Sequence, residues 1–395
     1  MNIVWIYDQP IIATNGGSER VTSLISKGLE KENIHTESFL IFDQKNDTIK
    51  INNQQMVENL YQYLTEKKID IIINQIGFAS WILESFLKHG GNKWKAEGGK
   101  IISVMHFSPI FPPNTIKLLL KEWSQLPLKR KIKRIGRILL LKQENKRTKI
   151  FHKESYKFIY NNSDSYVLLS STHIPEFQEM SKITDLSKIS IIPNPLTYDP
   201  NKLSINLSQK KNQVLIVSRL DEEQKKISYS LKAWKLIEKQ CPNWTLEIVG
   251  TGTDEWYYDL NFEAELDTKH KKYNLKRVFF HGHQEPLKYY QEASILLFTS
   301  PREGWGLTIT EAMENGVVPI VVDTCPVFRD ILNNNQCGIL VKEKDIKAYA
   351  NSILHIINNK KEREELANKG LERAKTFELH AITLQWKKLL TNLRP

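Results

Sequence analysis

The chain has 395 residues, 41% hydrophobic and 26% charged, and this composition is that of a folded protein large enough for two domains. It shows no bias towards disorder or collagen, and no apolar run approaches the ~20 residues that a membrane-spanning helix needs. The formal net charge of +11 is concentrated in one segment. Between Thr115 and Lys153 the chain has thirteen Lys or Arg and two Glu, so the rest is close to neutral.

The N-terminus, MNIVWIYDQP, has no cationic start before its short apolar run. We therefore expect a first strand there and no signal peptide. The three cysteines, Cys241, Cys325 and Cys337, lack the spacing of a disulfide framework or a metal site. This favours inert thiols in a reducing cytoplasm.

Strands and helices alternate through the first half. Apolar runs predict strands at 3–7, 35–41, 69–74, 101–105, 166–169 and 188–192, and helices from Gly17 to about Lys31 and near 173–180. Ile- and Val-rich strands separated by helices indicate a parallel sheet covered on both faces. Such sheets bind ligands at the carboxyl ends of their strands. Gly16-Gly17 and His106 fall at two of these ends. Taken alone, however, two glycines often serve only to make a bend, and a lone His is more often structural.

A basic amphipathic helix is predicted within the charged segment. Leu128, Ile132, Ile135 and Leu139 recur at i, i+4, i+7 and i+11 and form one apolar stripe. The other faces carry cations: Lys129, Arg130, Lys133, Arg134 and Arg137. Helices of this kind bind anionic membrane surfaces at ~1 kcal/mol per cation, and we expect this one to do so. One alternative is a solvated helix packed on its own domain. A second is nucleic-acid binding, which the lack of interleaved aromatics and of a known nucleic-acid module disfavours.

The second half repeats the alternation after a polar linker that ends near Asn212. We expect strands at 213–218, 244–249, 277–281, 295–298, 317–322 and 338–341, helices near 226–239 and 255–270, two helices after the last strand, and a final helix near 377–391. Gly250-Thr251-Gly252 lacks the third glycine of a dinucleotide fingerprint, because position 255 is Glu. This argues against a nicotinamide or flavin enzyme.

The stretch from Ile295 to Gly316, ILLFTSPREGWGLTITEAMENG, contains the most informative pattern in the chain. It predicts a buried strand, a turn through Gly304 and Gly306, and a helix that begins near Leu307. Backbone N–H groups and the positive end of a helix dipole suit an anion at such a turn. Two carboxylates, Glu303 and Glu311, flank it.

Glu303 and Glu311, separated by seven residues within EGWGLTITEAM, resemble the signature of family 4 retaining glycosyltransferases. The resemblance implies the α/β GT-B fold, with two Rossmann-like parallel-sheet domains facing a central cleft. Residues 1–197 would bind the acceptor, 198–376 would bind a nucleotide-sugar, and a C-terminal helix within 377–395 would return to the first domain. The first domain supports the resemblance only through Gly16-Gly17, His106 and its general layout.

The resemblance also implies roles for individual residues. Glu311 would hold the ribose and Glu303 a sugar hydroxyl. The backbone of one loop would hold the diphosphate and the donor sugar, through Gly304, Trp305, Gly306, Leu307 and Thr308. Gly16 and Gly17 would face the donor phosphate and the acceptor, and His106 would contact the donor sugar near the reacting carbon. Gly282, between His281 and His283, would border the base through its backbone.

Transfer of a sugar from a nucleoside diphosphate leaves negative charge on the diphosphate, and a cation must stabilise that charge. The sequence contains no Asp-x-Asp, so we expect no metal and no other cofactor. Arg219 and Lys225 follow the first strand of the second half, where an open sheet binds phosphate. An Arg fork with an ammonium suits a diphosphate, and the resemblance supports both positions, with Lys226 as an alternative to Lys225.

These features predict a retaining, metal-independent hexosyltransferase. It would move a hexose or N-acetylhexosamine from a nucleotide-sugar, with a UDP-sugar favoured, to a saccharide acceptor. The basic helix favours a lipid-linked acceptor in bacterial surface-polysaccharide synthesis, a peripheral location on the cytoplasmic face of the membrane, and no nucleic-acid partner. The alternatives are transfer to a protein or soluble sugar, and a non-catalytic partner subunit of the same fold. The family's glycine-rich loop is replaced here by Asp323-Thr324-Cys325-Pro326-Val327. The sequence therefore does not identify the donor sugar.

Overall fold

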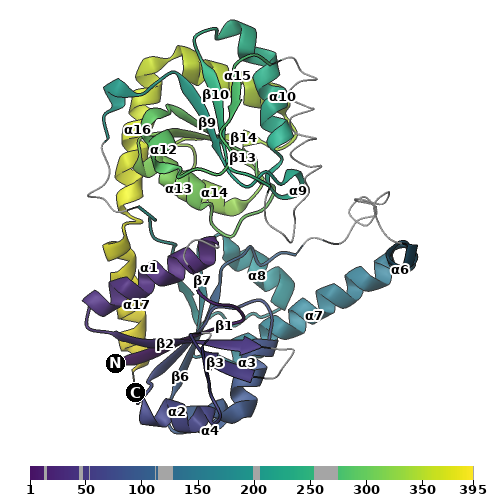
Figure 1. Cartoon of the computed structure of the whole chain (residues 1–395), viewed down its shortest axis with the longest axis vertical. Coiled ribbons are helices and arrows are strands. Elements are labelled where there is room, and N and C mark those ends of the chain that lie inside the picture. Colours follow the sequence, from purple (N-terminus) through teal and green to yellow (C-terminus); the bar gives the residue numbers. More distant parts are fainter. Residues whose placement is uncertain are drawn as a thin grey trace. The chain divides into compact units, whose positions relative to one another are not determined.

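The computed structural model describes residues 1–12, 16–43, 48–52, 54–111, 113, 128–198, 205–252 and 275–394, without the side chains of Lys129 and Arg130. The chain divides into two compact units, each with its own sheet and core (Figure 1). The first unit comprises Met1–Ile12, Leu29–Ile192 and Trp386–Pro395, and the second comprises Ala13–Gly28 and Pro193–Gln385. Helices α1 (Gly17–Lys31) and α17 (Leu379–Leu393) therefore contribute residues to both units.

The first unit is built on an eight-stranded sheet in the order β4-β3-β2-β1-β5-β6-β7-β8. Its strands are β1 (Asn2–Tyr7), β2 (His35–Asp43), β3 (Thr48–Ile51), β4 (Gln55–Met56), β5 (Ile71–Asn74), β6 (Lys100–Met105), β7 (Ser165–Leu168) and β8 (Ile189–Ile191). From β2 to β8 the neighbours are parallel, and the central strands are almost wholly apolar and buried because helices cover both faces. We expected a parallel sheet throughout. The edge differs, because β3 pairs antiparallel with both β2 and β4.

The helices of this unit that the structure describes, besides α1, are α2 (Leu60–Glu66), α3 (Trp81–Phe86), a π-helical turn η1 (Leu87–Gly91), α4 (Asn92–Ala96), α6 (Leu128–Leu139), α7 (Leu141–Asn162) and α8 (His173–Ser181). The long helix α7 is only partly packed. Its second half is buried through Tyr156 and Ile159, whereas Ile150 and Phe151 in its first half are about half exposed. Figure 1 shows α7 extending away from the sheet, with α6 at its outer end.

The second unit contains a six-stranded sheet, parallel throughout, in the order β11-β10-β9-β12-β13-β14. Its strands are β9 (Gln213–Val217), β10 (Thr245–Val249), β11 (Val278–Phe280), β12 (Ile295–Phe298), β13 (Val318–Asp323) and β14 (Ile339–Lys342). Its helices are α9 (Glu222–Lys225), α10 (Ile227–Ile237), α12 (Leu287–Glu292), α13 (Leu307–Glu314), α14 (Pro326–Ile331), α15 (Ile346–Asn358) and α16 (Lys360–Lys375), with 3₁₀ turns η4 (Leu207–Gln209) and η5 (Glu238–Gln240).

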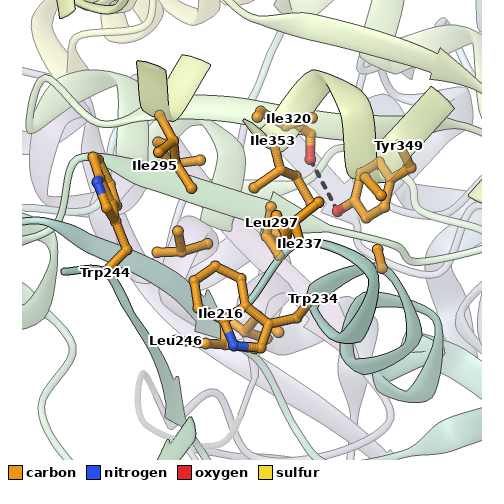
Figure 2. Packing of buried hydrophobic residues seen from close by; sticks show 14 of the residues in the cluster. Ile216, Trp234, Ile237, Trp244, Leu246, Ile295, Leu297, Ile320, Tyr349 and Ile353 are labelled. Atoms are coloured by element: carbon orange, nitrogen blue, oxygen red, sulfur yellow. Dashed lines mark hydrogen bonds between the residues drawn. The ribbon is translucent and has the colours of Figure 1, made fainter. Parts of the chain in front are cut away.

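One face of this sheet packs against α10 and α15 to form the largest core of the second unit (Figure 2). Trp234 and Ile237 from α10 meet Ile353 from α15 over the strand residues Ile216 and Leu297. The Tyr349 hydroxyl, buried in this core, donates a hydrogen bond to the Ile320 carbonyl at 3.3 Å. This packing fixes the sheet whose carboxyl edge carries the predicted donor site.

The strand positions expected from the sequence are confirmed to within two residues. The helix expected at 226–239 is observed as α10 followed by the 3₁₀ turn η5. The short helix α9, which ends just before Lys226 and its φ of +49°, was not expected. The helix expected at 255–270 and residues 199–204 of the linker lie outside the described residues.

Candidate functional site

Loops that follow neighbouring strands meet at the carboxyl edge of the second sheet. The Gly250 N–H after β10 donates to the Gly282 carbonyl after β11 at 2.8 Å, and the Leu220 N–H after β9 donates to the Thr251 carbonyl at 3.1 Å. Gly250 has a φ of +135°, and a Cβ atom there would lie 1.9 Å from the Ser218 carbonyl oxygen. Only glycine can occupy this position, because any larger residue would collide with the Ser218 backbone. The glycine therefore lets the loops after β9 and β10 lie side by side.

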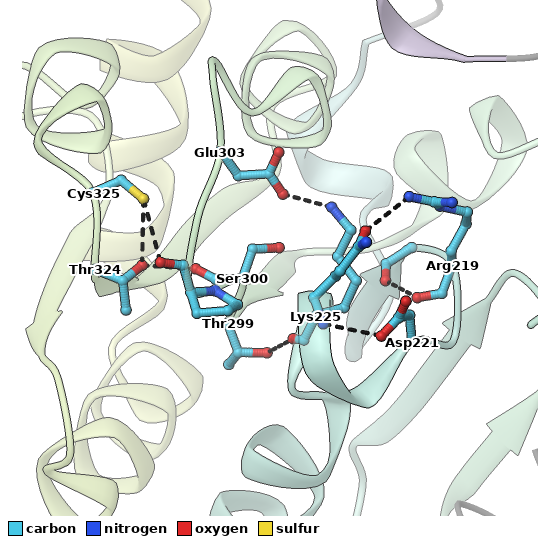
Figure 3. A network of polar contacts seen from close by, with 11 residues as sticks. Arg219, Asp221, Lys225, Thr299, Ser300, Glu303, Thr324 and Cys325 are labelled. Carbon is cyan, nitrogen blue, oxygen red and sulfur yellow. Dashed lines mark hydrogen bonds and ion pairs between the residues drawn. The ribbon is translucent and has the colours of Figure 1, made fainter. Parts of the chain in front are cut away.

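Lys225 and Glu303 form an ion pair within this edge, with 2.5 Å between Lys225 Nζ and Glu303 Oε1 (Figure 3). Short helix α9 carries Lys225. Asp221 caps α9 by accepting from the Glu223 and Gln224 N–H groups at 2.9 and 3.0 Å. At its other end, the Thr299 hydroxyl donates to the Lys225 carbonyl at 2.7 Å. These contacts attach α9 to the loop after β12, so residues 78 positions apart come together.

Arg219 lies on the same loop as α9, and its Nη2 atom donates to Gln224 Oε1 at 3.0 Å. Lys226, the alternative to Lys225, has its Nζ atom 3.9 Å from Glu343 Oε1. The structure therefore brings Lys225, and not Lys226, to Glu303.

The predicted anion loop leads into α13. Gly304 and Gly306 are buried, and Gly306 has a φ of +113° directly before the helix. No side-chain hydrogen bond caps α13, so Leu307 and Thr308 open the helix without one. Trp305 is 3% exposed and meets the Phe377 ring edge to face at 5.2 Å. A Cβ atom on Gly17 would lie 3.1 Å from Leu307 Cδ1, which places the glycine pair beside the start of α13. Gly16 immediately precedes Gly17 at the beginning of α1.

Glu311 is 4% exposed and accepts hydrogen bonds from three side chains. Its Oε1 atom accepts from Thr197 Oγ1 at 2.6 Å and from Arg20 Nη1 at 3.2 Å, and its Oε2 atom accepts from the Tyr290 hydroxyl at 3.0 Å. Sequence reasoning did not single out these donors. Arg20 lies three residues after the Gly16-Gly17 pair, whereas Thr197 and Tyr290 carry no motif that identifies them.

Glu314, one turn after Glu311, was also not predicted. It is 5% exposed, and its Oε2 atom has no hydrogen-bond partner in the described part of the chain. Burial raises the pKa of Glu314 to about 8, and the negative charges of Glu311 and Glu378 add to this effect. Glu314 on α13 is therefore protonated at neutral pH.

His106 belongs to the first unit and follows β6. Its Nε2 atom hydrogen-bonds Gln75 Oε1, and its Nδ1 atom is buried without a partner in the described structure. Burial lowers the pKa of His106 to about 4, so the imidazole is neutral at physiological pH. Gln75, which follows β5, is a further residue that no motif identified.

Gly282 has a φ of +65° between His281 and His283. The His281 ring pairs with buried Glu247 on β10, with 2.6 Å between Nε2 and Oε2, which fits the structural role we expected for that side chain. The unusual segment after Val322 contacts the loop after β12. The Thr324 hydroxyl donates to the Ser300 carbonyl at 2.7 Å (Figure 3). Asp323 pairs with Arg329 at 2.9 Å.

The basic helix is confirmed as α6, and its apolar stripe faces solvent. Leu128, Ile132, Ile135 and Leu139 are 73%, 62%, 45% and 79% exposed. Among the cations, the Arg137 Nε atom donates to Glu144 at 3.1 Å, and Lys133 is exposed. Arg134 is half-buried, and the side chains of Lys129 and Arg130 lie outside the described structure. The alternative in which this stripe packs on its own domain is therefore not observed.

The described residues contain no group of three or more His, Cys, Asp or Glu side chains that could hold a metal ion. None of their helices combines the length and the apolar character that crossing a bilayer requires.

Comparison with known proteins finds a family model that is similar to most of the second unit. Residues 199–373 match the family model described as glycosyl transferases group 1. Over the whole chain, a Campylobacter jejuni protein is 26% identical over 395 residues, covering 97% of this chain and 98% of that protein. It is named GalNAc-alpha-(1->4)-GalNAc-alpha-(1->3)-diNAcBac-PP-undecaprenol alpha-1,4-N-acetyl-D-galactosaminyltransferase.

Other relatives match over shorter stretches. An uncharacterized glycosyltransferase of Haemophilus influenzae is 27% identical over 228 residues, which are 58% of this chain and 61% of that protein. A UDP-N-acetylglucosamine–peptide N-acetylglucosaminyltransferase GtfA subunit of Streptococcus agalactiae is 27% identical over 54% of this chain and 43% of its own length. The chain thus spans about three fifths or less of the length of these two relatives.

Solved structures agree on the fold. HepE of Anabaena, solved with UDP-glucose, aligns with a TM-score of 0.69 at 14% identity, over 99% of this chain and all of that one. TarM aligns with a TM-score of 0.60 at 18% identity, over 87% of this chain and 61% of that one. The chain therefore has the α/β fold of GT-B glycosyltransferases, and its residues 199–373 match the family model of glycosyl transferases group 1.

Proposed function

We propose that the protein is a retaining, metal-independent glycosyltransferase that moves a hexose or N-acetylhexosamine from a UDP-sugar to a lipid-linked saccharide in cell-surface polysaccharide synthesis. The observation that carries this proposal is the Lys225–Glu303 pair, 2.5 Å apart at the carboxyl edge of the second sheet. That edge is where open parallel sheets bind ligands. Arg219 lies on the same loop, and α13 begins next to Glu303 with no side-chain cap.

The chemistry follows from these charges. When the anomeric C–O bond to the diphosphate breaks, the bonding electrons remain on the phosphate oxygen, and Lys225 and Arg219 stabilise that charge. Lys225 pairs with Glu303. A bound diphosphate attracts the ammonium, which leaves the Glu303 carboxylate to accept hydrogen bonds from sugar hydroxyls.

The acceptor hydroxyl attacks the anomeric carbon on the face that the diphosphate leaves. The new C–O bond forms there, and the departing phosphate oxygen takes the acceptor proton. Attack and departure on one face retain the anomeric configuration.

Glu311 would hold the ribose. Thr197, Arg20 and Tyr290 fix both of its carboxylate oxygens, so the group is oriented before the donor arrives. His106 is neutral, which fits a hydrogen-bonding role at the donor sugar and not that of a proton donor at pH 7.

The lipid-linked acceptor is supported by two observations. The Campylobacter relative, which spans nearly the whole chain, is named for a PP-undecaprenol-linked saccharide. Helix α6 exposes an apolar stripe beside cations, the arrangement that lies on an anionic membrane surface. We therefore place the protein peripherally on the cytoplasmic face of the membrane, without a nucleic-acid partner. The Streptococcus relative supports a protein acceptor as the second candidate. A non-catalytic subunit is disfavoured because Arg219, Lys225, Glu303 and Glu311 are all present.

A thermal-shift panel of UDP, GDP, ADP, CMP and their common sugars, with and without EDTA, tests the donor site. At 100 times its dissociation constant a ligand stabilises the folded state by ~2.7 kcal/mol. We expect UDP and one UDP-sugar to raise the melting temperature of the wild type, with or without EDTA. They should have no effect on Glu311→Ala. If no nucleotide raised it, the non-catalytic alternative would rank above the enzyme.

A further inference from the structure

The loop that follows His106 carries an exposed aromatic ring that the donor site does not use. Phe107 is 48% exposed, whereas the side chains around it are largely packed. Phe78, which follows β5, meets the Phe107 ring edge to face at 5.4 Å with an interplanar angle of 88°. Phe78 in turn contacts Phe111 at 5.8 Å, and Phe111 stacks on His152 of α7 at 3.9 Å. Phe107 thus packs on one side against an aromatic cluster, and about half of its surface is exposed to solvent.

Hydrogen bonds fix the rest of this loop. The Ser108 hydroxyl donates to Glu176 Oε2 on α8 at 3.2 Å, and the Ile110 N–H donates to Ser108 Oγ at 3.3 Å. The buried Tyr156 hydroxyl donates to the Pro109 carbonyl at 2.8 Å. The backbone around Phe107 is therefore positioned before any ligand binds.

Glu176 on α8 brings a carboxylate to Ser108, the residue that follows Phe107. It is half-buried, and Ser108 is its hydrogen-bond partner among the described residues. Burial raises the pKa of Glu176, and the charge of Glu179 acts in the same direction, while the Ser108 hydrogen bond opposes them. A half-buried carboxylate with one such partner gains from a further hydroxyl donor.

We propose that Phe107, Ser108 and Glu176 form the subsite for a pyranose ring of the acceptor saccharide. A pyranose has an apolar C–H face that covers an aromatic ring and a rim of hydroxyls that donate to a carboxylate. This subsite offers an aromatic ring on Phe107 and a carboxylate on α8, which Ser108 contacts. An anionic phosphate is disfavoured by Glu176, and a lipid chain gains nothing from that carboxylate. The inference rests on the proposed function only in assigning the sugar to the acceptor.

Saturation-transfer NMR tests the subsite, with the methyl α- and β-glycosides of glucose, galactose, N-acetylglucosamine and N-acetylgalactosamine as probes and UDP present. We expect at least one glycoside to receive saturation from aromatic protons of the wild type. Phe107→Ala should reduce that signal at least fivefold, and Phe107→Trp should preserve it. Phe279→Ala is the matched control, since Phe279 on β11 is 46% exposed in the second unit, and it should have no effect.

Glu176→Gln should also reduce the signal severalfold, whereas Glu179→Gln, at an exposed position on the same helix, should not. Melting temperatures of all variants identify any that fail to fold. If Phe107→Ala fails to fold, the conservative variants Phe107→Trp and Glu176→Gln still test the subsite. The inference is overturned if no glycoside gives a Phe107-dependent signal. If UDP stabilises the protein in that case, the donor site survives and only the subsite fails. If the glycoside binds but no nucleotide does, the subsite survives and the transfer reaction fails.

Discussion

At the scale of single residues, the site holds its charges in pairs before a donor binds. Lys225 neutralises Glu303, and the side chains are only 20% and 19% exposed. A partly buried pair interacts more strongly than a surface pair, because solvent screens it less. The donor must therefore provide more favourable partners for both groups, which its diphosphate and hydroxyls do.

Replacing Lys225 by Met should lower donor turnover by about 10²- to 10³-fold, because one of the two cations that meet the leaving diphosphate is lost. Turnover is measured as release of UDP from the UDP-sugar that the thermal-shift panel selects. Lys226→Met is the matched control. Its ammonium lies beside Glu343, so we expect a change below threefold. A larger loss in Lys226→Met than in Lys225→Met would assign the role to Lys226.

Glu314 makes stability depend on pH. Its folded-state pKa of about 8 lies above its ordinary value of 4.5. Between these values the folded protein keeps a proton that the unfolded chain releases, so the free energy of unfolding falls as pH rises, by up to about 1.4 kcal/mol per unit. Glu314→Gln removes this dependence, and its advantage over the wild type should grow from pH 4.5 to pH 8 and then level off.

Urea unfolding at pH 5, 6.5, 8 and 9 measures that difference. Glu365→Gln, at an exposed position on α16, is the control and should follow the wild type at every pH. Parallel curves for Glu314→Gln and the wild type would show that Glu314 ionises normally in the folded state.

At the scale of elements, α6 and the first half of α7 differ from the other helices in what they expose. A helix in a globular protein turns its apolar stripe to the core, yet α6 leaves Leu128, Ile132 and Leu139 more than 60% exposed. Such a surface is costly in water. The neighbouring cations, including Lys133, favour an anionic lipid surface as the binding partner of this stripe.

Changing Lys129, Arg130, Lys133, Arg134 and Arg137 to Gln should weaken binding to anionic vesicles by roughly 10³-fold, since each cation contributes ~1 kcal/mol at the membrane surface. Co-sedimentation with vesicles containing phosphatidylglycerol measures this, and phosphatidylcholine vesicles should bind weakly in every case. Ile132→Asn with Leu139→Asn should reduce binding through the apolar face alone. Changing the exposed Lys360, Lys361 and Lys375 of α16 to Gln is the control. Unchanged binding of the five-cation variant would remove the membrane from the proposal.

At the scale of the whole molecule, two parallel sheets with separate cores supply two sets of carboxyl-end loops. The second set holds the residues that we propose for donor binding, and the first carries His106 and the proposed acceptor subsite. The two carboxylates of the proposed donor site both have partners. Glu303 is paired with Lys225, and Glu311 accepts three hydrogen bonds.

We therefore expect the full-length protein to transfer with retention and without a metal. An α-linked UDP-sugar should give an α-linked product by NMR of the anomeric proton, and EDTA should leave the initial rate unchanged. The lipid-linked saccharide in the name of the Campylobacter relative is the first acceptor to use. A β-linked product would exclude the same-face mechanism, and loss of activity in EDTA that Mg²⁺ or Mn²⁺ restores would exclude metal independence.

Much of the architecture follows from local patterns. Runs such as Ile295–Phe298 are buried on both faces, so their near-continuous apolar character identifies the strands. The antiparallel edge strands β3 and β4 were missed because they are short and mostly half-buried or exposed, which gives them little apolar signal. The short helix α9 was missed because four residues give little periodic signal and because tertiary contacts hold it, including the hydrogen bond from the Thr299 hydroxyl to the Lys225 carbonyl.

The sequence by itself determined the loop between Glu303 and Glu311, the basic pair after β9 and the amphipathic helix, because each is a pattern of neighbouring residues. Only the tertiary structure decided that Lys225 rather than Lys226 meets Glu303, and that Arg20, Thr197 and Tyr290 orient Glu311. It also decided that the stripe of α6 is exposed and that Glu176 of α8 accepts a hydrogen bond from Ser108, the neighbour of Phe107. The physical reason is that pairing, burial and desolvation depend on residues far apart in the chain, and no local spacing encodes which of them meet.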